Sequence, residues 1–405
     1  MARREHFPLF DALRGIAALA VVTYHAVYLP ALYQGIGGGW WWRYVMHLDV
    51  AVPIFLGISG FLLYRPFVAA RLRDEPMPRI AAYGWRRFLR IVPGYWFALT
   101  VLTMWFWWQP PGFEEVRSLG GILRFYGFAQ LYSSDTAIAG IGQAWTLGVE
   151  VVFYALLPLW ALLMRRLKPG LRSELIGLAC LIAGSLAWKA AILTQVDYEP
   201  RSLHVVLPVP TWLDLLGLGM LLAVLSVHVQ QARPSWSWLR RVEARPSVAW
   251  AAALAFWLAA CWIGGPSGEA DDPVTDRIFL VRHVFYGLSV VCLLAPAVFG
   301  DPDAGGVRRV LRWRPFAYIG TISFSFYLFH YAVLDQMAKS FGRGPRSYVE
   351  LAGWWVLAIV GSVVLGTIGY RLVELPCMRL GRLVRSGPRE PAPDPSATAQ
   401  AKAAP

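Results

Sequence analysis

An acid, a guanidinium and an imidazole lie in one apolar stretch near the start of the chain. The segment "LFDALRGIAALAVVTYHAVY" (9–28) contains Asp11, Arg14 and His25. In a helix, Arg14 and His25 would be about three turns apart, so they would share a face and lie roughly 16 Å apart along the axis. Asp11 precedes Arg14 by one turn and can pair with it. Because a charge at mid-membrane costs about 2.5–3.5 kcal/mol, we expect this polar stripe to face protein or water.

Two carboxylates are expected at the same depth as His25, because the segments "HLDVAVPIFLGISGF" and "AWTLGVEVVFYALLPLW" each enter the bilayer with an acid, Asp49 and Glu150. A histidine beside a carboxylate is held in one tautomer and becomes more basic, as a general base requires. The alternative is that both acids cap their helices near the interface, and that the Asp11–Arg14 pair only locks helices together. We favour capping for Asp49 and a catalytic role for Glu150.

A group of arginines in "YGWRRFLRIVPGYW" (83–96) indicates an anion site. Arg87 and Arg90 lie one helical turn apart, and two guanidiniums so placed can hold a phosphate group. The alternative is that the segment contacts anionic lipid, as basic loops beside a membrane commonly do.

Weaker candidates are Ser59, which lies close to two glycines in "FLGISGFLLYR", Tyr24 beside His25, and His330 in "SFSFYLFHYAVLD". Ser59 and Tyr24 are candidates for donating a hydrogen bond to an oxyanion, whereas His330 is expected to be a buried, hydrogen-bonded histidine. Further polar residues inside apolar runs have no identifiable partner: Asp214, Lys189, Arg282 and His283. The four cysteines have no metal-ligand spacing, and we expect no metal.

The elements that carry these residues are apolar enough to cross a membrane. Of the 405 residues, 57% are hydrophobic and 16% charged, whereas soluble domains have about 25% charged residues. We therefore predict an all-α, polytopic integral membrane protein with about ten transmembrane helices. The expected spans are 8–29, 45–64, 88–108, 145–164, 174–194, 211–228, 247–264, 278–299, 316–338 and 349–370.

The distribution of Lys and Arg predicts that both termini lie in the cytoplasm. With the N-terminus inside, the inner segments hold 27 Lys and Arg residues and the outer segments hold 8, as the positive-inside rule requires. The net charge of +13 is therefore a topology signal, and nucleic acid is not expected as a partner. Residues 372–405 are predicted to be a cytoplasmic tail, disordered after about residue 385 because it is rich in Pro and Ala.

Six stretches, in order along the chain, resemble motifs of membrane-bound acyltransferase family three, the O-acyltransferases related to bacterial O-antigen acetylases. Two departures from the family pattern are Gly148, where Ser is common, and Val151, where a second Glu often follows Glu150. The similar stretches are "FDALRGIAALAVVTYHA" (Asp-x-x-Arg-Gly, then His), "HLDVAVPIFLGISGFLL" (Ser-Gly-Phe), "WRRFLRIVPGYW" (Arg-x-x-Arg), "AWTLGVEVVFYALLPL" (Trp-x-Leu-x-x-Glu), "YIGTISFSFYLFH" (Ser-x-x-x-Tyr-Leu-x-His) and "YRLVELP" (Glu-x-Pro).

The resemblance implies a transmembrane acyltransferase domain over residues 1–371 in a bacterial inner membrane. It implies an acyl-CoA donor, with acetyl-CoA expected, bound by Arg87, Arg90 and Arg14. His25, helped by Glu150, would take a proton from a hydroxyl of a cell-envelope glycan or glycolipid, and Arg14 is the third expected catalytic residue, steadying the pantetheine arm or a neighbouring carboxylate. Relatives often carry a fused SGNH-type domain, and we expect a stand-alone form here.

Three other functions remain open from the sequence. A macrolide-type natural product is an alternative acceptor. A proton-coupled transporter would also use intramembrane acids and a histidine, although no pair of broken helices in matching halves supports it. A non-enzymatic membrane scaffold is the third, but it would leave the polar stripe of 9–28 unexplained.

Overall fold

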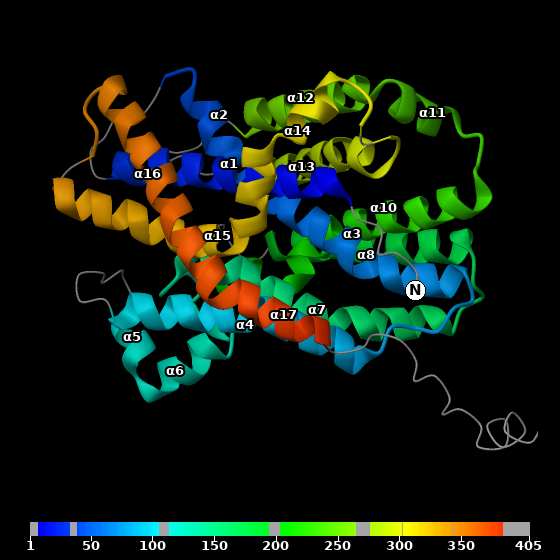
Figure 1. The fold of residues 1–405 in the computed structure, drawn as a ribbon, viewed down its shortest axis with the longest axis horizontal. Helices are drawn as coiled ribbons and strands as arrows, with labels where there is room; N and C mark the ends of the chain where they lie inside the picture. Colours follow the sequence, from blue (N-terminus) through cyan, green and yellow to red (C-terminus); the bar gives the residue numbers. More distant parts are fainter. Residues whose placement is uncertain are drawn as a thin grey trace, which may run out of the picture.

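The computed structural model describes residues 7–32, 39–104, 113–193, 203–264, 276–301, 303–342 and 344–383. Within these ranges the chain forms helices joined by turns and contains no β-strand (Figure 1). The all-α prediction is confirmed. The predicted disorder after about residue 385 lies outside the described residues.

Long helices run roughly side by side and make up the body of the molecule (Figure 1). They are α1 (Pro8–Leu32), α3 (Ala51–Leu72), α4 (Ile80–Met104), α7 (Trp145–Arg165), α8 (Leu171–Leu193), α10 (Leu213–Ala232), α12 (Pro246–Ile263), α13 (Asp276–Val298), α15 (Arg314–Phe341) and α16 (Tyr348–Gly369).

Short helices and turns connect the long ones, and a π-helical turn, Tyr370–Glu374, joins α16 to the last helix. The pair α5 and α6 projects from one end of the bundle (Figure 1). The short helices are α2 (Trp42–Met46), α5 (Phe113–Arg117), α6 (Leu119–Tyr126), α9 (Leu203–Val206), α11 (Ser237–Ala244), α14 (Gly306–Leu311) and α17 (Leu375–Leu383). The 3-10 turns are His47–Val50, Gln130–Tyr132, Gly142–Ala144 and Val209–Trp212.

Nine helical segments of the described residues are long and apolar enough to cross a membrane, and they correspond to nine of the ten predicted spans. The exception is α4, which was predicted to span at 88–108. It is a 25-residue helix, but Arg86, Arg87 and Arg90 in its first half lower its hydropathy, and residues 105–108 lie outside the described residues. The protein is an integral membrane protein, and the orientation of its termini stays a prediction.

Glycines allow α1 and α15 to pack with their backbones in close contact. A Cβ atom on Gly15 would overlap the carbonyl oxygen of Phe316, and one on Gly320 would overlap the carbonyl oxygen of Asp11. In lipid, small residues at a helix interface permit the close van der Waals contact that drives association. This contact holds α1 against α15, and farther along the same pair of helices His25 meets His330.

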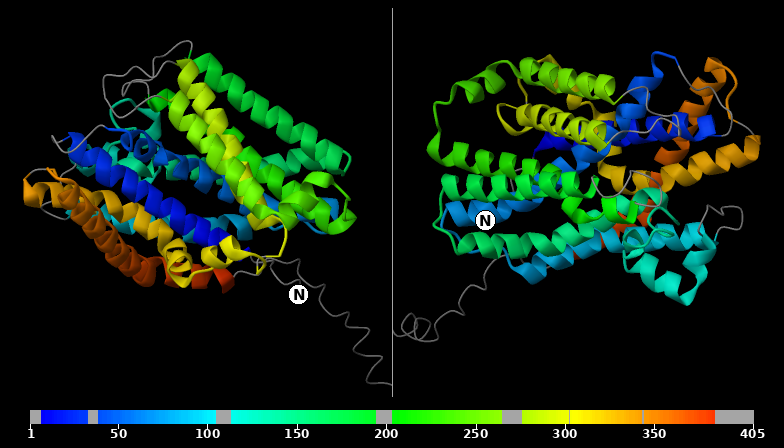
Figure 2. Two further views of the ribbon diagram at one scale, coloured as in Figure 1. Left: turned by 90° about the horizontal axis from the view of Figure 1, so that it is seen from above. Right: turned by 180° about the vertical axis from the view of Figure 1, so that it is seen from behind.

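Glycines also allow α3 and α10 to pack with their backbones in close contact. A Cβ on Gly60 would overlap the carbonyl oxygen of Leu216, and one on Gly219 would overlap that of Gly57. Seen from above, α1, α15 and α16 form one flank of the bundle, and α12 and α13 form the other (Figure 2).

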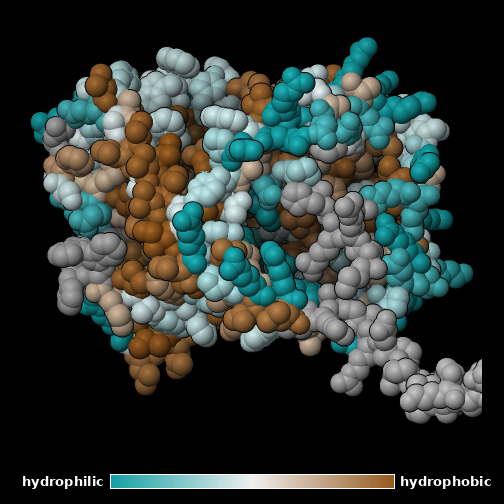
Figure 3. All heavy atoms as spheres, viewed as in Figure 1, coloured by the Kyte–Doolittle hydropathy of each residue, from teal (hydrophilic) through white to brown (hydrophobic). Residues whose placement is uncertain are grey.

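The surface agrees with a membrane location. Apolar side chains cover much of the left and centre of the view in Figure 3, and polar side chains gather at its right-hand end. Large apolar residues such as Leu159 on α7, Val248 on α12 and Leu357 on α16 are more than half exposed. Exposed apolar area of this extent is what contact with lipid tails requires.

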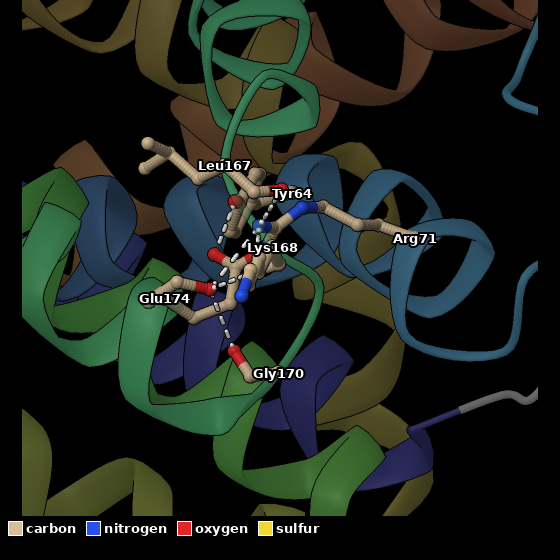
Figure 4. A network of polar contacts seen from close by, with 7 residues as sticks. Tyr64, Arg71, Leu167, Lys168, Gly170 and Glu174 are labelled. Atoms are coloured by element: carbon tan, nitrogen blue, oxygen red, sulfur yellow. Dashed lines mark hydrogen bonds and ion pairs between the residues drawn. The ribbon is translucent and has the colours of Figure 1, made fainter.

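A buried ionic cluster holds the α7–α8 turn against the end of α3 (Figure 4). The carboxylate of Glu174 on α8 accepts a hydrogen bond from the hydroxyl of Tyr64 at 2.6 Å and pairs with the guanidinium of Arg71. Arg71 also donates to the carbonyl oxygens of Leu167 and Lys168 in the turn. Glu174 is completely buried, so its charge depends on these partners.

Replacing Arg71 by Ala should destabilise the protein by about 3–5 kcal/mol, because it leaves a buried carboxylate without its cation. Thermal unfolding of the protein in detergent micelles measures the effect. Arg73→Ala is the matched control, since Arg73 is exposed and its guanidinium donates to the exposed Gln230, and surface changes cost about 0.5 kcal/mol or less. Equal melting temperatures for the two variants would contradict a stabilising role for the cluster.

Candidate active site

A cavity of about 370 Å³ lies in the bundle at the end where α1 finishes and α3, α7, α10 and α13 begin. Its lining is largely aromatic, and its polar side chains are His25, Asp49, Gln143, Arg282 and His283, together with several tyrosine hydroxyls. A concave, apolar pocket with a few converging polar groups is the usual form of a small-molecule site. Among the described residues, no group of three or more His, Cys, Asp or Glu is placed to hold a metal ion.

His25 lines this cavity and is backed by a second histidine. Its Nδ1 atom lies 3.0 Å from the carbonyl oxygen of Val21 and 3.2 Å from Nε2 of His330. His330 is completely buried, and its Nδ1 lies 2.7 Å from the carbonyl oxygen of Tyr327. The expectation of a buried, hydrogen-bonded histidine at position 330 is confirmed, but its partner is the candidate catalytic residue.

These contacts determine the tautomers of both rings. A carbonyl oxygen can only accept, so Nδ1 carries the hydrogen in His25 and in His330. Nε2 of neutral His330 is then an acceptor, and the Nδ1–H of His25 points toward both it and the Val21 carbonyl. The consequence is that Nε2 of His25 keeps its lone pair, which is the arrangement of a general base.

The hydrogen bonds behind His330 tie α15 to the turn that precedes α7. The side-chain amide of Gln143 donates to the carbonyl oxygens of Tyr327 and Leu328, at 3.2 and 3.0 Å. The hydroxyl of Tyr327 in turn donates to the carbonyl oxygen of Gln143 at 2.9 Å. This reciprocal pair fixes the carbonyl group that orients His330, and through His330 it fixes the ring of His25.

Asp49 lines the same cavity as His25. Its Oδ1 accepts a hydrogen bond of 2.5 Å from the hydroxyl of Tyr286 on α13. The interpretation of Asp49 as a helix cap is wrong, because neither the 3-10 turn that contains it nor α3 has a side-chain capping hydrogen bond. Tyr286 reaches Asp49 because α13 packs against α3, a contact that the local sequence around Asp49 does not reveal.

Glu150 does not reach His25, which corrects the prediction that it supports the histidine. Its carboxylate accepts hydrogen bonds from the hydroxyls of Ser59 and Tyr154, both at 2.8 Å. Ser59 therefore donates its proton to Glu150, and neither residue is part of the cavity lining. Tyr24, by contrast, lines the cavity beside His25, with the two ring centroids 4.8 Å apart.

Glu150 belongs instead to a polar group deeper in the bundle, toward the end where α1 and α4 begin. Arg14 lies 3.9 Å from Asp11 and within electrostatic reach of Glu150 and Tyr154. The predicted Asp11–Arg14 pair is thus present. Arg87 joins the group from α4, within electrostatic reach of Tyr154 and Tyr83.

Nε of Arg87 and the hydroxyl oxygen of Tyr83, one helical turn apart on α4, are buried without a hydrogen-bond partner among the described residues. An unpaired buried donor costs about 1–3 kcal/mol, so such atoms are commonly satisfied by a ligand or an ordered water. Their position makes this end of the bundle, called the arginine end below, a candidate site for an anion.

The sequence predicted that Arg87 and Arg90 together hold a phosphate group, but Arg90 is bound to a carboxylate of the protein. Its Nη1 donates to Oε2 of Glu374 at 3.0 Å. The other oxygen of Glu374 accepts from the backbone and the hydroxyl of Ser325, at 2.9 and 2.5 Å. Glu374 is 1% exposed. Arg90 therefore neutralises a buried carboxylate, whereas Nε of Arg87 is a buried donor without a partner among the described residues.

Sequence reasoning did not identify the polar group on the other side of the cavity. Nε2 of His283 lies 2.6 Å from Asp214, whose carboxylate also accepts from Lys189 at 3.4 and 3.5 Å. All three are buried. The available signal was that each is an ionisable residue inside an apolar run, which marks a functional candidate in a membrane protein. Their pairing depends on the packing of α8, α10 and α13.

The comparison with known families now adds to this geometry. Residues 8–371 match the sequence profile of the family described as "Acyltransferase domain". The chain belongs to this acyltransferase family. The resemblance to family three that the motifs suggested is confirmed, and the match covers nearly all of the described residues.

Curated relatives are bacterial proteins of low sequence identity. O-acetyltransferase OatA of Staphylococcus aureus is 22% identical over 387 residues, 93% of this chain and 58% of that protein. Peptidoglycan O-acetyltransferase OatA of Listeria monocytogenes is 20% identical over 394 residues, 93% of this chain and 57% of that protein. Acyltransferase MdmB of Streptomyces mycarofaciens is 26% identical over 419 residues, 97% of both chains. The chain thus spans less than two thirds of the two OatA proteins, and no solved structure matches it significantly.

The family motifs meet in pairs in the structure. His25 of the first motif contacts His330 of the fifth, and Ser59 of the second contacts Glu150 of the fourth. Arg90 of the third pairs with Glu374 of the sixth. Motifs that look independent along this acyltransferase chain therefore form three contacts between helices.

We expect His25 and His330 to be protonated on Nδ1 at neutral to mildly alkaline pH. Nitrogen-15 NMR of histidine-labelled protein in nanodiscs measures this, with signals assigned by their loss in His25→Gln and His330→Gln. In His330→Phe, the His25 tautomer should persist because the Val21 carbonyl still accepts, while its Nδ1 resonance shifts. His228, which stacks on Trp236 away from the cavity, provides the control substitution. A His25 ring protonated on Nε2 would contradict the assignment.

Proposed function

We propose that this protein is an O-acyltransferase that moves an acyl group, acetyl in the first instance, from acyl-CoA to a hydroxyl of a cell-envelope carbohydrate or glycolipid. The observation that carries the proposal is the lone pair of His25 Nε2 at the wall of an aromatic cavity, with Nδ1 held by the Val21 carbonyl and His330. Membership of the acyltransferase family and the two relatives named as O-acetyltransferases support the same reaction.

His25 acts in this proposal as a general base and then as a general acid. Nε2 takes the proton of the acceptor hydroxyl while the acceptor oxygen bonds to the acyl carbon and the carbon–sulfur bond breaks. The imidazolium then returns that proton to the departing thiolate, so no charge is left in the cavity. His330 stabilises the transient cation, because its Nε2 accepts from the Nδ1–H of His25 throughout.

We place the acyl donor, acyl-CoA, at the arginine end. The phosphates of CoA are polyanionic, and Arg87 and Tyr83 have buried donors there that meet no partner in the part of the chain that the structure describes. Arg14 and Glu150 belong to the same polar group, within electrostatic reach of each other, and would line the path of the pantetheine arm toward the cavity. Arg90 supports the site indirectly, since its guanidinium neutralises Glu374.

The cavity end receives the acceptor. Tyr24 lies beside His25 in the lining and is the better candidate for the oxyanion donor, because the hydroxyl of Ser59 is engaged by Glu150. With the N-terminus in the cytoplasm, as the distribution of Lys and Arg predicts, the end of α1 that carries His25 faces outward. An outward-facing cavity suits an acceptor of the cell envelope.

Two substitutions separate the two halves of this mechanism. His25→Ala should lower kcat by about 10²- to 10⁴-fold, the usual contribution of a general base. Arg87→Ala should weaken acyl-CoA binding by about 10- to 100-fold, because charged hydrogen bonds contribute about 1.5–3 kcal/mol. Turnover of radiolabelled acetyl-CoA by the protein in nanodiscs, with a panel of glycans and macrolides as acceptors, measures both effects.

His228→Ala and Arg73→Ala serve as controls, since neither residue contacts the cavity or the arginine end. Arg90→Ala is unsuitable for the binding test because it leaves the buried carboxylate of Glu374 without its cation. Full activity of His25→Ala would refute the catalytic role. If CoA is neither bound nor consumed while His25→Ala alters proton-coupled uptake in liposomes, the protein is a transporter instead.

A further inference from the structure

A second histidine in the cavity lining is also held in place by hydrogen bonds, but its partners differ from those of His25. His283 on α13 is 4% exposed, lines the cavity, and has Nε2 at 2.6 Å from Oδ2 of Asp214. Asp214 is fixed in turn by Ser185 on α8. The hydroxyl of Ser185 lies 3.2 Å from Oδ1 of Asp214 and accepts from its backbone N–H at 3.0 Å. The acyl-transfer step proposed above does not explain why the imidazole of His283 is held by so many buried polar groups.

The charges of this group indicate the protonation state of His283. The carboxylate of Asp214 is already balanced by the ammonium group of Lys189, which is 1% exposed. A cationic His283 would add an uncompensated buried charge, with the guanidinium of Arg282 next to it in the cavity lining. His283 is therefore neutral, its Nε2–H donates to Asp214, and its Nδ1 is a hydrogen-bond acceptor.

The surroundings of His283 suit an organic ring better than a water cluster. The indole of Trp212 packs on the imidazole with ring centroids 5.6 Å apart, and Trp145 lies 5.0 Å from Trp212. The weakly positive C–H groups of a saturated ring are attracted to the negative faces of aromatic rings. A ligand held between these faces would present its hydroxyl hydrogens to the accepting nitrogens.

We propose that His283, held by Asp214 and Lys189, binds the acceptor through a second hydroxyl, one that is not acylated, and so orients the reacting hydroxyl toward His25. The proposal rests on the acyl transfer proposed above and adds a residue to it. It requires an acceptor with at least two hydroxyl groups, because His25 and His283 each accept one hydrogen.

Steady-state kinetics of the protein in nanodiscs tests the proposal. The probes are acetyl-CoA with methyl glucoside and methyl N-acetylglucosaminide, their singly deoxygenated forms, and cyclohexanol as a one-hydroxyl acceptor. His283→Gln is the main variant, because a Gln amide can still donate to Asp214 while the accepting ring nitrogen is lost. His228→Gln is the matched control.

For wild type, we expect one deoxygenated glycoside to have a KM raised about 10-fold or more, since a site built to bond a hydroxyl rejects the analogue that lacks it. His283→Gln should raise the KM of the parent glycoside by a similar factor with kcat changed less than about 3-fold, and it should no longer distinguish the deoxygenated form. His283→Asn, whose amide lies near the Nδ1 position, should recover part of this selectivity.

Cyclohexanol as good an acceptor as the glycosides, or equal sensitivity to deoxygenation in wild type and His283→Gln, would overturn the proposal. If His283→Gln does not fold, as judged by thermal unfolding, His283→Asn carries the same comparison. If the wild-type protein consumes no acetyl-CoA with any of these acceptors, the proposed acyl transfer to them is refuted. Saturation-transfer NMR of the same glycosides then decides: binding that His283→Gln weakens selectively supports the role of His283, and equal or absent binding overturns it.

Discussion

Polar groups inside this bundle have to find their partners within the protein, because a bilayer offers no water in place of a missing hydrogen bond. The carbonyl oxygens of Val21 and Tyr327 each lie within hydrogen-bonding distance of a histidine Nδ1, and these two contacts leave Nε2 of His25 with its lone pair. The same requirement explains why Glu374, Glu174 and Asp214, all nearly or fully buried, each have a cation beside them. A buried group can bind or react with a substrate only where it keeps a lone pair or a hydrogen-bond donor that the protein does not use. The candidates are His25, His283, Tyr83 and Arg87.

The pairing of the family motifs follows from this constraint. A charged or strongly polar residue is costly to bury alone, and three of the motif residues, His25, Glu150 and Arg90, each meet a residue on another helix. Glycine contacts bring those helices close enough: Gly15 and Gly320 join α1 to α15, where His25 meets His330. The arrangement separates a polar region at the arginine end, which includes Arg14, Glu150 and Arg87, from an aromatic cavity at the other end.

Local patterns in the sequence were sufficient for nine of the ten predicted spans, for the pairing of Asp11 with Arg14 and for a polar face on the first helix, since these depend on residues within a few turns of one another. They could not assign the partners of that face. Glu150 bonds to Ser59, 91 residues away, and His283 bonds to Asp214, 69 residues away. Such pairs depend on which helices pack together, and no periodicity within a single helix specifies this. Tyr286 and Glu374 likewise reach Asp49 and Arg90 from distant helices, and no local pattern around either residue indicates these contacts.

The central claim is that donor and acceptor meet at His25 from opposite ends of the bundle. It is tested most directly in sealed proteoliposomes whose orientation is set by protease protection of an N-terminal tag. Labelled acetyl-CoA is added on the side of the N-terminus, and a glycoside acceptor is placed either in the same compartment or in the opposite one. The account predicts that labelled product forms only from acceptor in the opposite compartment, and that His25→Ala abolishes it. Product formed only when donor and acceptor share a compartment would contradict transfer across the membrane.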